Sequence, residues 1–512
     1  MLEPRPNETA LRSPRLRING WAFSNSYAAL PGRFFARLDP VPVAEPRLIK
    51  FNAALATELG LERASLDDAT LAAVFSGNTI PEGAEPIALA YAGHQFGQFV
   101  PQLGDGRAIL LGEMVDRSGT RRDIQFKGSG RTPYSRSGDG RAALGPVLRE
   151  YLVSEAMHAL GIPATRSLAA VATGEVVFRE RALPGAIVTR VAASHVRVGT
   201  FEYFAARQDR DAVQVLADYV IDRHYPDLKR ADRPYLELLR TVCRRQAALV
   251  ASWMHAGFIH GVMNTDNTAI SGETIDFGPC AFMDAYDPAT VFSSIDAMGR
   301  YAYANQPPAA QWNLARFAET LLALIDADVN RAVEAAGAEI DAFSEHFGLE
   351  WLIGMRHKFG LLTPLDGDLE LVRAWLDTMH RNGCDYTLTF RRLCDAADPD
   401  ADARAADAEL RSSFSQPGAY ESWAADWRSR LAREPDPGKL RARSMRRVNP
   451  AFIPRNHRVE QIIAAAIEQA DFAPFEELLK VLSHPYEAQP GFEAYAAPPQ
   501  PAERVLRTFC GT

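Results

Sequence analysis

The sequence predicts an α+β fold in which a strand-rich part precedes a mainly helical part. Residues 87–190 show strand patterns around one helix, and residues 196–396 carry apolar side chains at helical spacing. The length of 512 residues exceeds what one small core holds and indicates roughly two to four structural units. With 47% hydrophobic and 23% charged residues, most of the chain is expected to fold.

The composition also excludes several classes of protein. No apolar run approaches the roughly 18 residues of a membrane helix, and the N-terminal segment lacks the apolar stretch of a signal peptide. We therefore expect a soluble, cytoplasmic protein with no membrane partner. A monomer is a separate expectation that these observations do not decide. The net charge of −8 argues against a nucleic-acid partner. The five cysteines show no C-x-x-C pair and no zinc spacing, so no structural metal is expected.

The first 86 residues are turn-rich and include an aromatic stretch. We expect an extension packed on the core, with a helix over Pro46–Leu59. Near the other end, the acidic segment Asp395–Leu410 is interpreted as a solvated linker or a weak helix. Residues 458–470 are expected to form a helix, and Pro-rich coil precedes the C-terminus.

Two strands joined by a turn at Asp116–Gly119 are expected within residues 102–130. Because strand side chains alternate, Ile124 and Phe126 share one face and Lys127 points to the other. A lysine in this place suits a phosphate contact, although a solvated charge is the commoner explanation of a lysine at a strand end.

Glycines near these strands suggest two further phosphate contacts. Gly104 and Gly106, with Arg107, would let backbone N–H groups and a guanidinium approach phosphate oxygens, although such a pair is more often a simple turn. Asp139 and Gly140 lie just before a predicted helix, whose N-terminus favours anions.

That helix, predicted within residues 141–160, should pack on the sheet and supply a carboxylate partner for Lys127. Glu155 falls inside the apolar stripe and Glu150 nearly opposite, so periodicity favours Glu155. A solvated Glu150 and a locally paired Glu155 remain alternatives.

Two arginines are further candidates for the phosphate site. Arg190 ends a buried strand, and Arg197 follows it by seven residues. The guanidinium of either residue suits a phosphate contact, and a structural salt bridge is the alternative.

The segment HGVMNTDNTAISGETIDFG, from His260 to Gly278, has the order of a kinase catalytic loop. A helix from about Pro234 to His255 leads into it, and a hairpin turning at Ser271 and Gly272 is expected before Asp276. Asn267 and Asp276 offer oxygen ligands that suit Mg²⁺ or Mn²⁺.

The order of elements predicts a protein-kinase-like two-lobed fold with N-terminal and C-terminal extensions. The expected parts are an extension over 1–86, a small lobe over 87–192, a large lobe over 193–396 and a C-terminal helical extension and tail over 397–512.

The catalytic base of a kinase is replaced in this loop. Val262 occupies its position and cannot accept a proton. Asp266 is the one carboxylate inside the loop, directly before Asn267, and is therefore the candidate base. Because its place relative to the metal differs from that in a kinase, attack on the α-phosphate, with pyrophosphate leaving, is the natural reaction to expect.

Together, YAGHQFGQFVPQLGDGR from Tyr91, LREYLVSEAMHALGIPATRSLA, HGVMNTDN and NPAFIPRNHRVE resemble the selenoprotein O family. Its members are kinase-fold pseudokinases that bind ATP in an inverted orientation and transfer AMP to protein hydroxyls. The resemblance implies ATP as substrate, with UTP an alternative, and Mg²⁺ or Mn²⁺ held by Asn267 and Asp276. It implies that Lys127 holds the terminal phosphates with Glu150 as its partner, and that Asp266 is the base. The nucleotide site would be lined by Gly104, Gly106, Arg107, Asp139, Gly140, Arg190 and Arg197, besides Asp276.

The same resemblance suggests a regulatory disulfide between Cys280 and Cys510, two ordinary thiols being the alternative. The leading hypothesis is a protein adenylyltransferase that acts on Ser, Thr or Tyr hydroxyls. A kinase-like phosphotransferase that uses the γ-phosphate, and a catalytically inactive nucleotide-binding scaffold, are the alternatives.

Overall fold

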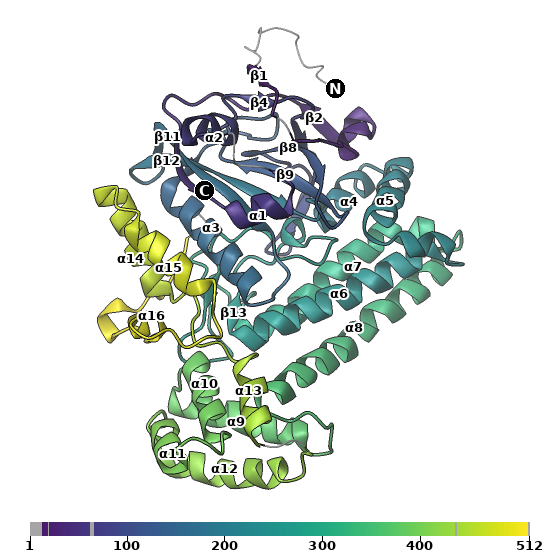
Figure 1. The fold of residues 1–512 in the computed structure, drawn as a ribbon. Coiled ribbons are helices and arrows are strands. Elements are labelled where there is room, and N and C mark those ends of the chain that lie inside the picture. The colour runs from purple at the N-terminus through teal and green to yellow at the C-terminus, as the bar shows by residue number, and fades with distance from the viewer. Residues whose placement is uncertain (1–12, 19, 62–65, 436–437, 510–512) are drawn as a thin grey trace. The chain divides into compact units, whose positions relative to one another are not determined.

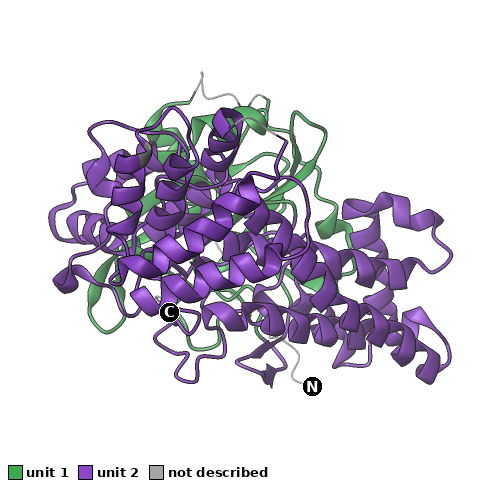
Figure 2. Ribbon diagram, turned by 90° about the horizontal axis from the view of Figure 1, so that it is seen from below, with its two compact units in different colours: residues 1–90, 103–147, 167–193 green, residues 91–102, 148–166, 194–512 purple. Residues whose placement is uncertain are grey.

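The computed structural model describes residues 13–18, 20–61, 66–435 and 438–509. Its described part mixes helices and strands, so the predicted α+β class is confirmed. The chain divides into two compact units (Figure 2). Unit 1 comprises residues 1–90, 103–147 and 167–193, and unit 2 comprises residues 91–102, 148–166 and 194–512.

Unit 1 is built on an eight-stranded sheet in the order β2-β5-β8-β9-β12-β11-β3, with β10 paired to β12 (Figure 1). Its strands are β2 (Phe35–Arg37), β3 (Arg47–Phe51), β5 (Ile87–Leu89), β8 (Ala108–Val115), β9 (Arg121–Lys127), β10 (Ala142–Ala143), β11 (Arg166–Phe178) and β12 (Ala182–Ala192). A short parallel pair, β1 (Arg15–Leu16) with β4 (Ile80–Pro81), and helices α1 (Ala53–Glu58) and α2 (Asp68–Phe75) complete the unit.

The core of unit 1 lies between α2 and one face of this sheet. Leu71 and Phe75 of α2 belong to the same buried cluster as Ile124 and Phe126 of β9. Lys127 and Gln125 alternate with these two residues and therefore lie on the opposite face. The predicted turn between β8 and β9 is present, because the Asp116 carboxylate accepts the N–H groups of Ser118 and Thr120, both at 2.9 Å.

The predicted helix over Pro46–Leu59 is wrong in its first half. Residues 47–51 form β3, which pairs with β11 in the register Ala169 with Phe51. The helical half survives as α1, which begins where the Asn52 side chain accepts the N–H of Leu55 at 3.1 Å. Pairing with a distant strand overrides the local helical pattern.

Unit 2 is mainly helical, as predicted for residues 196–396. Its long helices α6 (Pro234–Ala256), α7 (Gln306–Ile325) and α8 (Val329–Lys358) pack side by side (Figure 1). The others are α4 (Val198–Ala205), α5 (Arg210–His224), α9 (Asp368–Asn382), α10 (Tyr386–Ala396), α11 (Ala403–Arg411), α12 (Pro417–Leu431), α13 (Gly438–Arg446), α14 (Asn456–Gln469), α15 (Ala473–Leu482) and α16 (Glu493–Ala496). Helix α3 (Leu144–Ala159) begins in unit 1 and continues in unit 2.

Two short antiparallel strand pairs in unit 2 lie near the predicted catalytic loop. One pair contacts the loop in space, and the other contains the strand that directly precedes it in the sequence. They are β6 (Gly93–Gln95) with β7 (Gln98–Val100), and β13 (Phe258–Ile259) with β14 (Ala281–Phe282). Helix α6 ends at Ala256, and the next residue, Gly257, has a φ of 72°, the left-handed conformation that stops a helix. The chain then enters β13 and the loop at His260.

Of the two interpretations of residues 395–410, the helical one is right over most of the segment. Helix α10 runs to Ala396, and α11 begins after Asp402, whose carboxylate accepts the N–H groups of Arg404 and Ala405. The predicted helix over 458–470 is present as α14. None of the described helices combines the length and the apolar character that a membrane-spanning segment needs.

Lys358, the last residue of α8, is buried in unit 2 with 2% of its surface exposed. Its ammonium lies 4.2 Å from the Phe390 ring centroid and 5.3 Å from that of Tyr386. Burial lowers the pKa of Lys358 to about 7. An unfolded lysine keeps a pKa near ~10.4, so from about pH 7 to 10 the unfolded chain binds more protons and stability rises with pH. Below pH 7 the full cost of the buried charge is present.

Lys358→Met should therefore raise the free energy of unfolding by about 2–4 kcal/mol at pH 6 and by less at pH 9. Urea denaturation of both proteins at the two pH values measures the difference. Lys480→Met, at an exposed position of α15, should change neither value. An equal gain at both pH values would contradict the prediction.

Candidate active site

The loop that begins at His260 is held by a buried, neutral imidazole. The Nε2 of His260 lies 2.9 Å from the carbonyl oxygen of Ile275, and the N–H of Val262 approaches Nδ1 at 3.4 Å. Burial lowers the pKa of His260, which agrees with an Nε2–H donor and an Nδ1 acceptor. The His260 N–H donates to the side chain of Gln306 in α7 at 3.0 Å. The imidazole thus joins the two ends of the predicted motif.

Asp266 lies in the 3-10 turn Thr265–Asn267 and is 8% exposed. Gln95 donates to Oδ2 at 3.4 Å, whereas Oδ1 is buried with no hydrogen-bond partner among the residues that the structure describes. Burial raises the pKa of Asp266 to about 7, against the opposing effect of the Arg197 guanidinium. A carboxylate that has an oxygen without a hydrogen-bond donor and a pKa near neutrality is suited to accept a proton.

Arg197 connects Asp266 with Asp276. It is buried immediately before α4, and its Nη1 donates to the backbone oxygen of Asp266 at 3.0 Å. The same nitrogen lies 3.5 Å from Oδ2 of Asp276, and the guanidinium stacks on Tyr91 at 4.5 Å. The salt-bridge interpretation of Arg197 is therefore present in the structure. Its predicted contact with the nucleotide stays a prediction.

Asn267 and Asp276 present oxygen atoms in different ways. The Nδ2 of Asn267 donates to the carbonyl of Val262 at 3.0 Å, which fixes the amide plane and leaves Oδ1 as an acceptor. Asp276 has a φ of 64°, a left-handed conformation that costs a non-glycine residue energy. Within the described ranges no group of three or more His, Cys, Asp or Glu side chains could hold a metal ion. The amide and carboxylate oxygens nevertheless fit Mg²⁺ or Mn²⁺ that takes its remaining ligands from phosphates.

The predicted hairpin before Asp276 is wrong, although its turn exists. The Gly272 N–H donates to Ala269 at 3.2 Å, and Gly272 has a φ of 79°. The flanking residues do not pair with each other: Ala269 bridges to Arg197 and Thr274 to Ala164. Pairing with distant segments therefore positions Asp276.

The β6–β7 hairpin also contacts the site, which the sequence did not predict. The N–H of His94 donates to Thr265 Oγ1 at 2.7 Å, and the N–H of Phe96 donates to Asn264 Oδ1 at 3.0 Å. The Thr265 hydroxyl in turn donates to Glu202 of α4, whose carboxylate also contacts the His94 ring. No local feature of residues 93–100 indicates this contact, because His94 and Thr265 are 171 residues apart in the sequence.

The contact between the β6–β7 hairpin and Asp266 can be tested by a substitution at Gly93. A Cβ there would lie 2.6 Å from Oδ1 and 3.0 Å from Cβ of Asp266, while the φ of Gly93 is not positive. Gly93→Ala should therefore displace Asp266 and lower kcat by about 10–100-fold with little loss of stability. Gly348→Ala, within α8 and with nothing near its added Cβ, is the matched control and should retain full activity. Full activity of both variants in a transfer assay would contradict the expected contact.

In unit 1, Lys127 and Arg190 lie on the face of the sheet opposite α2. Arg190 pairs in register with Gln125, and its Nη1 donates to Gln125 Oε1 at 3.3 Å. Gln125 donates in turn to Asp105 Oδ2 at 3.1 Å. Both cations are buried, Lys127 at 8% and Arg190 at 2% exposure. The solvated interpretation of Lys127 is therefore wrong.

The glycines before β8 are required by packing within unit 1. Gly104 has a φ of 71°, and a Cβ on it would lie 2.3 Å from the Tyr134 ring. A Cβ on Gly106 would lie 2.9 Å from the backbone oxygen of Tyr134. The half-buried Arg107 follows directly. The loop around Tyr134 thus lies against the segment predicted to contact phosphate.

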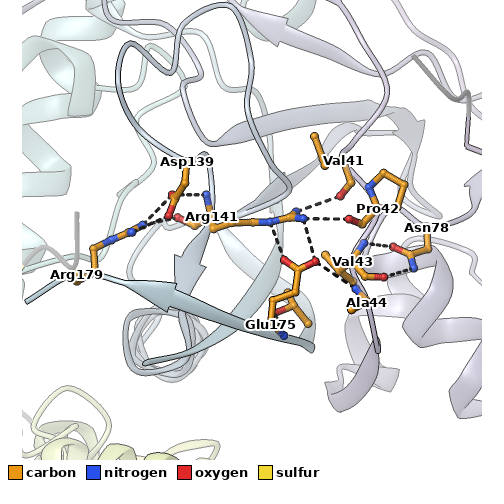
Figure 3. A network of polar contacts seen from close by, with 10 residues as sticks. Val41, Pro42, Val43, Ala44, Asn78, Asp139, Arg141, Glu175 and Arg179 are labelled. Carbon is orange, nitrogen blue, oxygen red and sulfur yellow. Dashed lines mark hydrogen bonds and ion pairs between the residues drawn. The ribbon is translucent and has the colours of Figure 1, made fainter. Parts of the chain in front are cut away.

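Asp139 has a structural partner as well (Figure 3). It forms an ion pair with Arg179 at 2.8 Å and accepts the N–H of Arg141 at 2.9 Å. Hydrogen bonding from Arg179 lowers the pKa of Asp139. Arg141 extends the network to the carbonyls of Val41 and Pro42, and Gly140 has a φ of 70°. The short strand β10 separates Asp139 and Gly140 from α3, so they do not cap the helix directly.

The two candidate glutamates on α3 are distinguished by their surroundings in unit 2. Glu155, which periodicity favoured, is held by Arg166 through two hydrogen bonds of 2.8 Å. The locally paired interpretation of Glu155 is therefore right. Glu150 is buried, so its solvated interpretation is wrong. The pairing of Glu150 with Lys127 stays a prediction. Cys280 is buried, while Cys510 lies outside the described residues.

Comparison with known proteins agrees with the resemblance. The family model "Protein adenylyltransferase SelO" matches residues 18–483. A relative named "Protein nucleotidyltransferase YdiU" from Rhizobium johnstonii is 66% identical over 96% of this chain and 97% of its own length. Relatives of the same name from Rhizobium meliloti and a Bradyrhizobium species are 64% and 63% identical, over 97% and 96% of this chain and 100% and 99% of theirs. The chain belongs to the SelO family of protein adenylyltransferases.

Proposed function

We propose that this nucleotidyltransferase transfers AMP from ATP to Ser, Thr or Tyr hydroxyls of other proteins, with release of pyrophosphate. UTP is proposed as an alternative donor, with UMP transferred. The observation that carries the proposal is Asp266, a buried carboxylate whose Oδ1 has no hydrogen-bond partner in the described part of the chain. It lies in a loop where Val262 stands at the base position of a kinase. Such a group can remove a proton from an alcohol.

In the proposed reaction the hydroxyl oxygen of the target attacks the α-phosphorus of ATP. The bond from that phosphorus to the bridging oxygen breaks, pyrophosphate leaves, and the proton passes to Asp266. Arg197 and Gln95 hold Asp266 in place through the contacts at 3.0 and 3.4 Å. Asn267 and Asp276 would hold Mg²⁺ or Mn²⁺, which neutralises phosphate charge when bound.

The residues that contact the nucleotide are part of the proposal. Lys127, paired with Glu150, and Arg190 are proposed to hold the terminal phosphates, because both are buried cations on the same face of the unit 1 sheet, and phosphate is the anion that suits them. Gly104, Gly106, Arg107, Asp139, Gly140 and Arg197 are proposed to line the rest of the nucleotide. A protein-kinase-like two-lobed fold with boundaries near residues 86, 192 and 396, a cytoplasmic location and a monomeric state belong to the same proposal. So does a regulatory disulfide between Cys280 and Cys510.

ATP labelled at either the α- or the γ-phosphate tests the reaction. Label from the α-phosphate that stays on protein supports adenylyl transfer. Label from the γ-phosphate alone supports a kinase-like phosphotransferase, and no label on any protein supports a nucleotide-binding scaffold. Val262 opposes the kinase alternative because it cannot accept a proton. Running the assay with Mg²⁺ and with Mn²⁺, and with labelled UTP, resolves the preferred metal and donor.

A further inference from the structure

A cavity of about 160 Å³ that is partly open to solvent lies in unit 2, away from the loop of Asp266. The residues that directly follow α3, the last turns of α6 and α8, and the C-terminal segment around Val448 and Tyr486 line it. None of the lining residues belongs to the loop 260–278. Its volume is about five times the ~30 Å³ of one water molecule in the liquid, which leaves room for a ligand of several non-hydrogen atoms.

Lys358 is the charged group of this cavity. It lines the cavity from the end of α8 and is 2% exposed. Its ammonium contacts the faces of the Phe390 and Tyr386 rings. The Asn449 side chain donates to the backbone oxygen of Lys358 at 2.9 Å, whereas Lys358 Nζ forms no hydrogen bond or ion pair with any residue that the structure describes. Cys394 and His255 also lie close enough to interact with it electrostatically, but neither is an anion: burial raises the pKa of the Cys394 thiol and lowers that of the His255 imidazole. The described residues therefore give this buried ammonium no oxygen acceptor for its three N–H donors.

The cavity wall has no acidic side chain to supply an acceptor. Its titratable members besides Lys358 are His255, His357 and Tyr486. The Nε2 of His255 lies 2.9 Å from the carbonyl of Trp351, and burial lowers the pKa of this imidazole to about 4, so it is neutral. Tyr486 donates its hydroxyl to Leu160 at 2.9 Å. The cavity wall therefore offers no negative group to the protonated form of Lys358, and an anion that pairs with it has to come from outside the wall.

We propose that this cavity binds a small oxyanion, of the carboxylate or phosphate type, whose oxygens accept hydrogen bonds from Lys358 Nζ. The low pKa of Lys358 in the described chain agrees, because an anion is the partner that would restore the ammonium form. The bound anion would connect α6, which leads into the loop at His260, with α3, α8 and the C-terminal segment.

Thermal denaturation of the full chain with inorganic phosphate, or with acetate, tests the site. At concentrations well above Kd, at least one of them should raise Tm by about 2 °C in the wild type. Lys358→Met should lose this rise, and Lys480→Met, at an exposed position, should keep it. Because phosphate can also occupy the nucleotide site, the measured quantity is the difference between Lys358→Met and Lys480→Met. An identical response of the two variants to both anions would overturn the proposal.

A second measurement uses the wild-type protein alone and does not depend on the Lys358→Met variant. Crystals of the wild-type protein soaked in selenate should show an anomalous selenium peak within hydrogen-bond distance of Lys358 Nζ. A cavity that contains only water in the soaked crystals, while selenate binds elsewhere, would refute the oxyanion site. Acetate acting alone in the thermal assay would assign the site to carboxylates, and phosphate acting through Lys358 would assign it to phosphates.

Discussion

Asp266→Asn should lower the rate of AMP transfer by about 10²–10⁴-fold and leave ATP affinity nearly unchanged. The asparagine has the shape of the aspartate but cannot accept a proton from the target hydroxyl. Burial already raises the pKa of Asp266 to about 7, so removing this charge relieves a desolvation cost and should not unfold the protein. The rate is measured with α-labelled ATP, and the affinity by calorimetry on the same preparations.

Asp341→Asn, at an exposed position of α8, is the matched control and should transfer AMP like the wild type. Equal rates for Asp266→Asn and the wild type would remove Asp266 as the base. A parallel loss of ATP binding would make Asp266 a binding residue instead, because a group that acts only on the target hydroxyl leaves the nucleotide complex intact.

The regular elements with strong local signals could be predicted from the sequence. The β8–β9 hairpin follows from its turn residues around Asp116, and α6 follows from a sustained apolar stripe that ends at Gly257. Residues 47–51 could not be assigned correctly, because their conformation depends on β11 more than 100 residues later. Pairing with distant segments also explains why the hairpin predicted before Asp276 is absent: Ala269 and Thr274 each bridge to a segment far away in the sequence instead of to each other.

The candidate site was predictable where chemistry is encoded in residue type and spacing. His260, Asp266, Asn267 and Asp276 follow from one motif. The β6–β7 hairpin does not, because the contact of Gly93 with Asp266 depends on folding across the sequence. Periodicity also favoured Glu155 over Glu150, because it measures which face of a helix is apolar and cannot detect an arginine, Arg166, that neutralises a carboxylate on that face.

Asp276→Asn should remove metal-dependent nucleotide binding, with a loss of affinity of at least about 100-fold in the presence of Mg²⁺ or Mn²⁺. The carboxylate is the one formal negative charge of the proposed ligand pair, and Asn267 alone presents a neutral oxygen. Asparagine tolerates the left-handed backbone at this position, where φ is 64°, better than alanine does. The substitution therefore tests charge with little added backbone strain. Calorimetry with ATP, with metal and with EDTA, measures the metal-dependent part.

The same substitution separates the role of Asp276 from that of Asp266. The Asp276 charge raises the pKa of Asp266, whereas the Arg197 guanidinium, 3.5 Å from Asp276, lowers it. Removing the Asp276 charge therefore lowers the pKa of Asp266, because Arg197 then has one carboxylate fewer to neutralise. Asp266 should then be ionised over a wider pH range, and a surviving loss of activity cannot come from a protonated base. If ATP affinity in Asp276→Asn stayed equal with metal and with EDTA, while the wild type responded to metal, Asp276 would be a metal ligand. If the variant still bound ATP more tightly with metal than with EDTA, as the wild type does, the ion would have to be held by other oxygens.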